Sequence, residues 1–155
     1  MSQNDSDGPT RSEEELLEDK KSLLPGSGLA WHQFTEPDHR ILRTFVNLSE
    51  IDYNIEITSN EMTALCPLTG FPDFYKLVIN YTPGRLCLES KSVKFYLGSF
   101  RDAGMFIEAL TNRIADDIVK ACSPKNLSVC NTMNARGGIP IMVTVERYKE
   151  RYRDE

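Results

Sequence analysis

A cysteine at the edge of a loop is the first residue whose surroundings suggest chemistry. Residues 65–74 read L-C-P-L-T-G-F-P-D-F, so Cys66 begins a loop rich in proline and glycine. Asp73 follows seven residues later, where the chain can fold back. A thiolate is a strong nucleophile at neutral pH, and the addition that it begins needs a nearby proton donor. The pair predicts nucleophilic catalysis; the alternative is that Cys66 is a small apolar residue before a turn.

A second candidate site is a short basic cluster. Residues 89–101 contain three bases, Lys91, Lys94 and Arg101, against one acid, Glu89, which gives a local charge of +2. Lysines three residues apart lie on one face of a helix, where they could hold a ligand that carries phosphate. The alternative is a solvated helix face, which is how many charge clusters end.

Two further positions could contact a ligand. Glu108 lies in the first turn of a predicted helix, where an acid complements the helix dipole or accepts two parallel N–H bonds from a guanidine-like edge. Arg136 precedes Gly137 and Gly138, and glycine lets the backbone approach a ligand closely. A hairpin turn explains the two glycines equally well.

Hydrophobic periodicity predicts the elements that position these residues. Strict alternation predicts four strands, over residues 51–58, 74–82, 127–133 and 139–145. A four-residue repeat predicts a helix over 105–121, with Phe106, Leu110, Ile114 and Ile118 facing inward and Asp116, Asp117 and Lys120 facing outward. A shorter helix is predicted over 92–99. Strands that come in pairs around helices favour an α+β fold, in which an antiparallel sheet carries two helices on one face, in the order β-β-α-α-β-β.

The charge of the chain is divided unevenly. The 155 residues have a formal charge of −5, and residues 1–24, with seven acids and three bases, contribute −4 of it. Residues 1–28 are polar and punctuated by glycine and proline, which predicts an acidic, disordered extension. Residues 29–155 are predicted to form one domain.

Several classes of protein are disfavoured by composition. No apolar run is long enough to span a bilayer, and the first residues lack the regions of a signal peptide. The four cysteines include no C-x-x-C pair, and only His32 and His39 are available beside them, so we expect no metal site. The broad basic excess of a nucleic-acid binder is missing. We therefore expect a cytoplasmic protein that binds neither nucleic acid nor membrane.

Three motifs together resemble one family. They are E-S-K-S-x-K-x-Y-x-x-S-F-R at residues 89–101, L-C-P-x-T-G-x-P-D-F at 65–74 and R-G-G-I at 136–139. They resemble the NADPH-dependent nitrile reductases (QueF) that convert 7-cyano-7-deazaguanine to 7-aminomethyl-7-deazaguanine in queuosine biosynthesis, a tRNA-modification pathway. The single short domain resembles the unimodal branch of that family.

The resemblance implies roles for individual residues. Cys66 matches the nucleophile that forms a covalent thioimide with the nitrile, and Asp73 matches the proton donor. Glu108 matches the carboxylate that grips the guanidine-like edge of the deazapurine. The other implied substrate contacts are Leu88, Glu89, Ser90 and Ile107. The charge of Lys91, Lys94 and Arg136 makes them candidates for binding the phosphates of NADPH.

The resemblance also implies the tunnelling fold, in which antiparallel sheets of several subunits join into a barrel with active sites between subunits. A pentameric ring or a decamer is the expected assembly, and the small-molecule deazapurine is the expected substrate.

One position departs from the family pattern, because Ile107 stands where the family usually has histidine. This leaves open an impaired or binding-only relative that holds a deazaguanine without reducing it. A QueF-like amidinotransferase would use Cys66 and Asp73 without NADPH, but the intact signature at residues 89–101 disfavours it. A zinc-dependent pterin-type enzyme would need a set of Cys and His ligands that the chain does not supply.

Overall fold

The structure is a computed structural model that describes residues 36–149. The chain divides into two units, Met1–Ala30 and Trp31–Glu155, and the described residues belong to the second. The predicted acidic extension over residues 1–28 lies outside them. No helix in the described part is long and apolar enough to cross a membrane.

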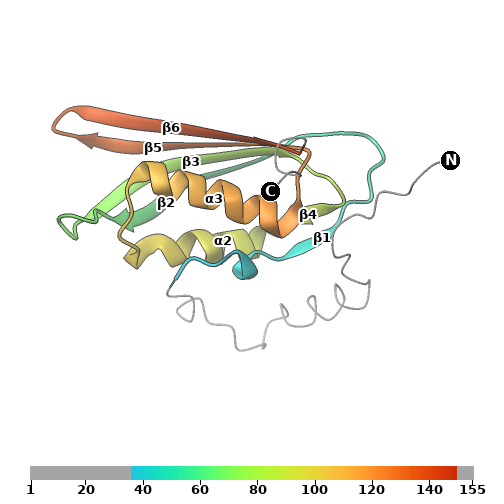
Figure 1. Cartoon of the computed structure of the whole chain (residues 1–155), viewed down its shortest axis with the longest axis horizontal. Helices are drawn as coiled ribbons and strands as arrows, with labels where there is room; N and C mark the ends of the chain where they lie inside the picture. The colour runs from blue at the N-terminus through green and yellow to red at the C-terminus, as the bar shows by residue number, and fades with distance from the viewer. Residues whose placement is uncertain (1–35, 150–155) are drawn as a thin grey trace. The chain divides into compact units, whose positions relative to one another are not determined.

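The main sheet has four antiparallel strands in the order β2-β3-β5-β6 (Figure 1). Their bounds are β2 (Ile55–Leu65), β3 (Pro72–Thr82), β5 (Asn126–Arg136) and β6 (Ile139–Tyr148). All four predicted strands are therefore confirmed, with β2 shifted toward the C-terminus. Pairing of β2 with β3 begins at Ile55 opposite Tyr81, because β3 ends at Thr82 and the following Pro83 has no N–H to donate.

One face of this sheet carries the hydrophobic core. In β3 the predicted alternation is confirmed, since Tyr75, Leu77, Ile79 and Tyr81 are all buried. The helices α2 (Ser90–Gly98) and α3 (Ile107–Cys122) lie together beneath the sheet, with the short 3-10 helix η3 (Ser99–Asp102) between them in sequence (Figure 1). The predicted α+β class with two helices on one face of an antiparallel sheet is confirmed.

The inward stripe of α3 agrees with the prediction at Leu110, Ile114 and Ile118, which are all buried. At Phe106 the prediction is wrong. This residue is the N-cap of α3, with extended backbone, and its side chain is exposed. The helix starts one residue after it, so Phe106 does not share the helical periodicity.

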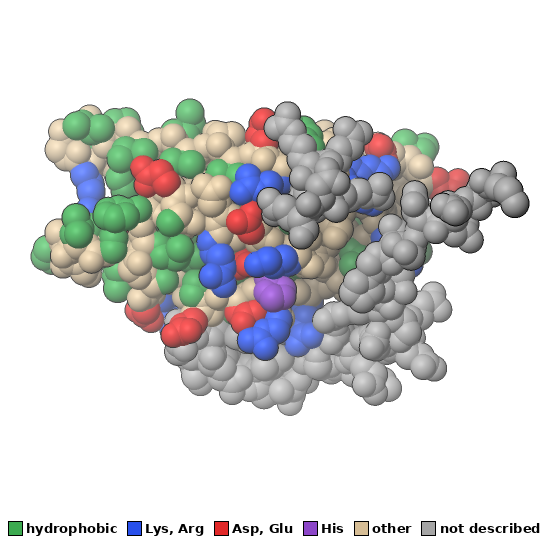
Figure 2. All heavy atoms as spheres, in the orientation of Figure 1, with side chains coloured by type: hydrophobic (Ala, Val, Ile, Leu, Met, Phe, Trp, Pro, Cys, Tyr) green, Lys and Arg blue, Asp and Glu red, His purple; other side chains and the backbone are tan. Residues whose placement is uncertain are grey.

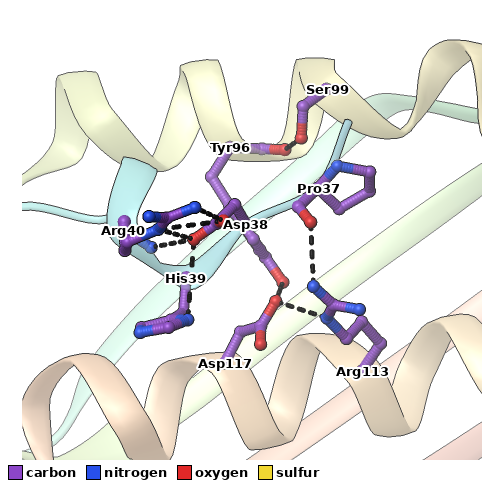
Figure 3. Close-up of polar contacts among 8 residues, drawn as sticks. All are labelled: Pro37, Asp38, His39, Arg40, Tyr96, Ser99, Arg113 and Asp117. Carbon is purple, nitrogen blue, oxygen red and sulfur yellow. Dashed lines mark hydrogen bonds and ion pairs between the residues drawn. The ribbon is translucent and has the colours of Figure 1, made fainter. Parts of the chain in front are cut away.

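Asp117 corrects a second part of the prediction, because this carboxylate is buried in α3 and does not face outward. It accepts hydrogen bonds from the Tyr96 hydroxyl at 2.9 Å and from Arg113 Nε at 2.8 Å (Figure 3). Arg113 Nη2 in turn donates to the Pro37 carbonyl at 2.8 Å. The carboxylate thus joins α2, α3 and the segment before the 3-10 helix η2 (His39–Ile41).

A second sheet was not predicted. It consists of β1 (Thr44–Val46) and β4 (Leu86–Leu88), which pair antiparallel. Each strand has only three residues, which is too short to show an alternating pattern. This sheet lies at the end of the main sheet opposite the β2–β3 and β5–β6 turns, and α2 begins beside it (Figure 1).

Candidate active site

Three segments meet at one end of the main sheet: the loop between β2 and β3, the turn between β5 and β6, and the start of α3 (Figure 1). The predicted catalytic motifs lie on these segments. Hydrophobic side chains gather at this end of the molecule (Figure 2). The exposed large hydrophobic residues on these segments are Leu68, Phe71, Phe106 and Ile139.

The β2–β3 loop is fastened to the chain just before α3. The Leu65 N–H donates to the Ala103 carbonyl at 2.9 Å, and the Met105 N–H donates to the Leu65 carbonyl at 3.1 Å. These bonds form a parallel bridge between Leu65 and Gly104. We call this pair of hydrogen bonds the loop clamp.

The loop clamp fixes two candidate site residues relative to each other. Cys66 follows Leu65 directly, and Glu108 lies three residues after Met105, in the first turn of α3. The segments also pack closely, because a Cβ atom at Gly104 would lie 3.6 Å from the Pro67 Cα atom. Main-chain hydrogen bonds therefore join the two segments that carry Cys66 and Glu108.

The Cys66 loop closes on itself. The Cys66 N–H donates to the Phe71 carbonyl at 2.8 Å, and the Gly70 N–H donates to the Cys66 carbonyl at 2.9 Å. Gly70 has a φ of +70°, a left-handed conformation that glycine adopts without steric cost. The loop therefore presents a half-buried Cys66 side chain in a defined backbone conformation.

The surroundings of Cys66 favour its thiolate. Hydrogen bonds from the Thr69 hydroxyl and from the N–H groups of Thr69 and Leu68 lower the pKa of Cys66 to about 7, and Arg136 adds a weaker effect in the same direction. Burial has the opposite effect on Cys122, whose pKa rises to about 12. Since the thiolate is the nucleophilic form, its lowered pKa suits Cys66 to nucleophilic attack.

Asp73 and Arg136 form an ion pair. Asp73 is the second residue of β3 and is only 6% exposed, whereas Arg136 is the last residue of β5 and keeps a half-exposed side chain. The structure thus brings together three predicted site residues: Cys66, Asp73 and Arg136. Arg136, predicted to bind a cofactor phosphate, lies against the candidate proton donor in this structure.

The β5–β6 turn determines where Arg136 lies. Gly137 and Gly138 have φ values of +56° and +80°, the left-handed conformations that a two-residue hairpin turn requires. Both glycines are thus explained by the hairpin, and Arg136 is paired with Ile139 across it.

A second group of predicted residues lies elsewhere in the chain. Glu89 is the N-cap of α2, and its carboxylate accepts hydrogen bonds from the N–H groups of Lys91 at 2.7 Å and Ser92 at 2.8 Å. Leu88 is buried at the end of β4, while Ser90 is exposed at the start of α2. Because α2 begins beside β4, the structure does not bring this group to the Cys66 loop of the same chain (Figure 1).

The remaining predicted positions are Ile107, Lys91 and Lys94. Ile107 is the first residue of α3, and its aliphatic side chain is 4% exposed within the core. Lys91 and Lys94 are both exposed on α2. Across residues 36–149, no group of three or more His, Cys, Asp or Glu side chains could hold a metal ion.

From the sequence, Tyr75 is placed only on one face of the predicted strand 74–82, with no role in the site. Its side chain is buried on β3, two residues after Asp73 and on the same face. The charged groups that act on its hydroxyl include Asp73, Arg136, Cys66 and Glu108. The alternation of β3 gave the position of this residue, but no motif indicated that its polar end lies among the site residues.

Comparison with known proteins identifies the family. A family model described as QueF-like protein matches residues 72–152. The chain belongs to the QueF-like family. It is 50% identical over 100 residues to the NADPH-dependent 7-cyano-7-deazaguanine reductase of Chlorobaculum tepidum, an alignment that covers 64% of this chain and 86% of that protein. It is 45% identical over 117 residues to the protein of the same name from Magnetococcus marinus, covering 75% and 91%.

A solved structure shares the fold of this QueF-like protein. It is the archaeosine synthase QueF-Like in its apo form, with a TM-score of 0.55 and 18% sequence identity, and the match covers 63% of this chain and 94% of that one. The predicted family is confirmed, and the fold of the single chain agrees with the predicted tunnelling fold.

Proposed function

We propose that this QueF-like protein is an NADPH-dependent reductase of 7-cyano-7-deazaguanine that forms 7-aminomethyl-7-deazaguanine for queuosine biosynthesis in the cytoplasm. The observation that carries the proposal is a thiol with a pKa of about 7, Cys66, on a loop beside the ion pair of Asp73 and Arg136. The relatives described above carry the name of this reductase. We propose that residues 29–155 form the reductase domain.

In the first step the Cys66 thiolate adds to the nitrile carbon and forms a C–S bond. Asp73 takes up the proton that Cys66 loses when the thiolate forms and passes it to the nitrile nitrogen, which gives a neutral thioimide. Glu108, exposed at the start of α3, accepts two N–H bonds from the guanidine-like edge of the deazapurine. The loop clamp joins the backbone beside Cys66 to the segment that leads into Glu108, which favours holding the heterocycle while its nitrile is attacked.

Overall, the conversion of nitrile to amine takes two hydrides and two protons, the first of which is the proton delivered by Asp73, and NADPH would supply the hydrides when it is bound. Lys91 and Lys94 fit this cofactor, because two exposed ammonium groups three residues apart can pair with its phosphates. Arg136 can pair with a phosphate of this cofactor only if its side chain first leaves the ion pair with Asp73. After the first reduction the carbon expels the Cys66 thiolate, which leaves an imine. The second reduction converts this imine to the amine. The imine has to be shielded from water until the second reduction, because water would hydrolyse it.

We further propose that the complete site forms between subunits. Leu88, Glu89 and Ser90 lie at the start of α2, away from the Cys66 loop of their own chain, so they can join that loop only in a neighbouring subunit. The sheet order leaves β2 and β6 as edge strands, and such edges can pair with another copy to extend a sheet into a barrel. The expected assembly is a pentameric ring or a decamer.

The test is incubation with 7-cyano-7-deazaguanine. NADPH absorbance is followed in one arm, and intact mass is measured without NADPH in another. We expect two NADPH consumed per amine formed, and a covalent adduct equal in mass to the whole nitrile. Cys66→Ala should abolish the adduct, whereas Cys130→Ala, on β5, should keep it.

The other outcomes identify the alternatives. An adduct without NADPH oxidation would support the impaired or binding-only relative, in which Ile107 replaces the usual histidine. An adduct that reacts with an amine donor but not with NADPH would support an amidinotransferase. Neither adduct nor NADPH oxidation would overturn the proposed function.

A further inference from the structure

The hydroxyl of Tyr75 is a buried polar group that the proposed mechanism does not use. The side chain is 2% exposed, and its hydroxyl has no hydrogen-bond partner among residues 36–149. Buried polar groups are nearly always paired, because leaving one unpaired costs stability. The unpaired hydroxyl of Tyr75 therefore calls for a functional or structural explanation.

Other buried tyrosines of this fold have partners. The Tyr81 hydroxyl accepts a hydrogen bond from the Leu88 N–H at 3.0 Å, and the Tyr96 hydroxyl donates to Asp117 at 2.9 Å (Figure 3). Tyr81 lies on the same face of β3 as Tyr75. The lack of a hydrogen-bond partner is therefore specific to the surroundings of Tyr75 and is not a general property of the buried tyrosines.

The surroundings of Tyr75 are those of the candidate active site. Asp73 and Tyr75 are two residues apart on one strand, so both side chains point to the same face of the sheet. The cross-strand neighbours of Tyr75 are Met62 on β2 and Met133 on β5, whose thioethers are at best weak acceptors. The charges that act on the hydroxyl belong to Asp73, Arg136, Cys66 and Glu108, the charged groups of the site.

The same surroundings keep the hydroxyl neutral. Burial, with a further contribution from the Asp73 carboxylate, raises the pKa of Tyr75 to about 12. Cys66, with a pKa of about 7, is ionised well below that pH. At neutral pH the site therefore combines a thiol that is about half ionised with a neutral O–H donor.

We infer that Tyr75 is a further catalytic residue, whose hydroxyl donates a hydrogen bond to the substrate nitrogen that becomes basic when Cys66 adds to the nitrile. This inference rests on the proposed function. The nitrogen is one bond from the carbon that Cys66 attacks, and it receives its proton from Asp73, the neighbour of Tyr75 on β3. Tyr75 keeps its own proton throughout, so no bond forms or breaks at its oxygen. Ile107, at the start of α3, offers only an aliphatic side chain and cannot make this hydrogen bond.

A structural explanation competes with this inference. Asn131 is fully buried on β5 opposite Leu77, and both polar atoms of its side chain also have no partner among residues 36–149. An internal water molecule between Tyr75 and Asn131 would pair both groups and serve the fold alone. The two explanations differ in what removal of the hydroxyl changes.

The experiment is Tyr75→Phe, which removes the hydroxyl and keeps the ring. We expect adduct formation with 7-cyano-7-deazaguanine in the absence of NADPH to slow by roughly tenfold or more. The pH at which the adduct rate reaches half its maximum should stay near 7, because Cys66 sets it. The melting temperature should stay the same or rise, because an unpaired polar atom has been removed from the core.

Tyr96→Phe is the matched control, since it removes a paired tyrosine hydroxyl away from the site. It should lower the melting temperature and leave the adduct rate unchanged. If Tyr75→Phe lowers the melting temperature but forms adduct at the wild-type rate, the structural explanation holds and the inference is overturned. An unchanged rate at an unchanged melting temperature overturns it as well. A wild-type chain that forms no adduct overturns both the inference and the proposed function.

Discussion

The reactivity of Cys66 depends on its immediate neighbours. The Thr69 hydroxyl gives the largest contribution to its lowered pKa, ahead of the N–H groups of the same loop. The thiolate fraction rises as the pH passes through about 7 and is nearly complete one to two pH units above it. Oxidation-prone behaviour is therefore expected of this cysteine more than of the buried Cys87 and Cys122.

A first prediction concerns this hydroxyl. Thr69→Val keeps the shape of the side chain and removes the donor, so the pKa of Cys66 should move up toward the ordinary value of a thiol. The measurement is the rate of iodoacetamide alkylation of Cys66 against pH, located by peptide mass. We expect the midpoint to shift from about 7 to higher pH. Cys66→Ala identifies the signal, and an unshifted midpoint would contradict the assigned cause.

At the scale of elements, the buried carboxylate of Asp117 is the polar link between the helices. It holds the Tyr96 hydroxyl of α2 and the Arg113 guanidinium of its own helix (Figure 3). The hydrogen bond to Asp117 raises the pKa of Arg113, so this cation stays charged at any pH at which the fold exists. The Asp117 side chain therefore links α2 to α3 in addition to their shared hydrophobic core.

A second prediction follows for stability. Asp117→Ala leaves the Tyr96 hydroxyl and the Arg113 guanidinium without this partner and should lower the free energy of unfolding by about 3 kcal/mol. Urea denaturation measures the change. Asp116→Ala is the control, because Asp116 is half exposed and pairs with Arg147 at the surface. The Asp116 substitution should lower the free energy of unfolding by less than about 1 kcal/mol. Equal losses in the two variants would contradict the role assigned to the buried Asp117 carboxylate.

A third prediction uses two glycines in different backbone conformations. Gly137→Ala forces a side chain into φ near +56° and should cost about 1 kcal/mol of unfolding free energy. Gly98→Ala places the same methyl group at φ −64° and ψ −24° at the end of α2, with open space around it. It should be neutral or stabilising by up to about 1 kcal/mol. The same denaturation measurement tests both, and the prediction requires opposite signs or a clear difference.

The elements also show what the sequence can and cannot predict. The long alternation of β3 and the repeat of α3 predicted both elements, because a regular period repeated over several turns outweighs local exceptions. Asp117 was placed outward because a charge is normally solvated; its partner Tyr96 comes from another helix, which no local pattern reveals. The loop clamp and the pairing of Asp73 with Arg136 are tertiary contacts of the same kind. The motifs gave the residues of the site, whereas the distances between them required the fold.

At the scale of the whole molecule, the site residues fall into two groups at opposite ends of α2. Cys66, Asp73, Glu108 and Arg136 lie at the end of the sheet that carries the two turns. Glu89 already caps α2 through two hydrogen bonds. A site that needs both groups is complete only where two copies meet.

A fourth prediction tests this arrangement by complementation. Cys66→Ala and Glu89→Gln should each be inactive in NADPH oxidation when every subunit carries the change. Mixed oligomers, obtained by co-expression with two different affinity tags, should regain activity because some interfaces combine an intact Cys66 with an intact Glu89. Sedimentation should give five or ten times the chain mass of 17.6 kDa. Mixed oligomers as inactive as the parents would show that both residues act within one chain.

The loop clamp has a consequence for how the site fluctuates. Leu65 uses both its N–H and its carbonyl to hold the segment that leads into α3, so the loop cannot swing away while that segment stays in place. Opening of the loop and fraying at the start of α3 are therefore one cooperative event, in which nucleophile and carboxylate are displaced together. In the native state we then expect the Cys66 loop and the start of α3 to be ordered together. We expect the hydrogen bonds of Leu65 to disfavour a state in which the Cys66 loop stays in place while the segment that leads to Glu108 is displaced.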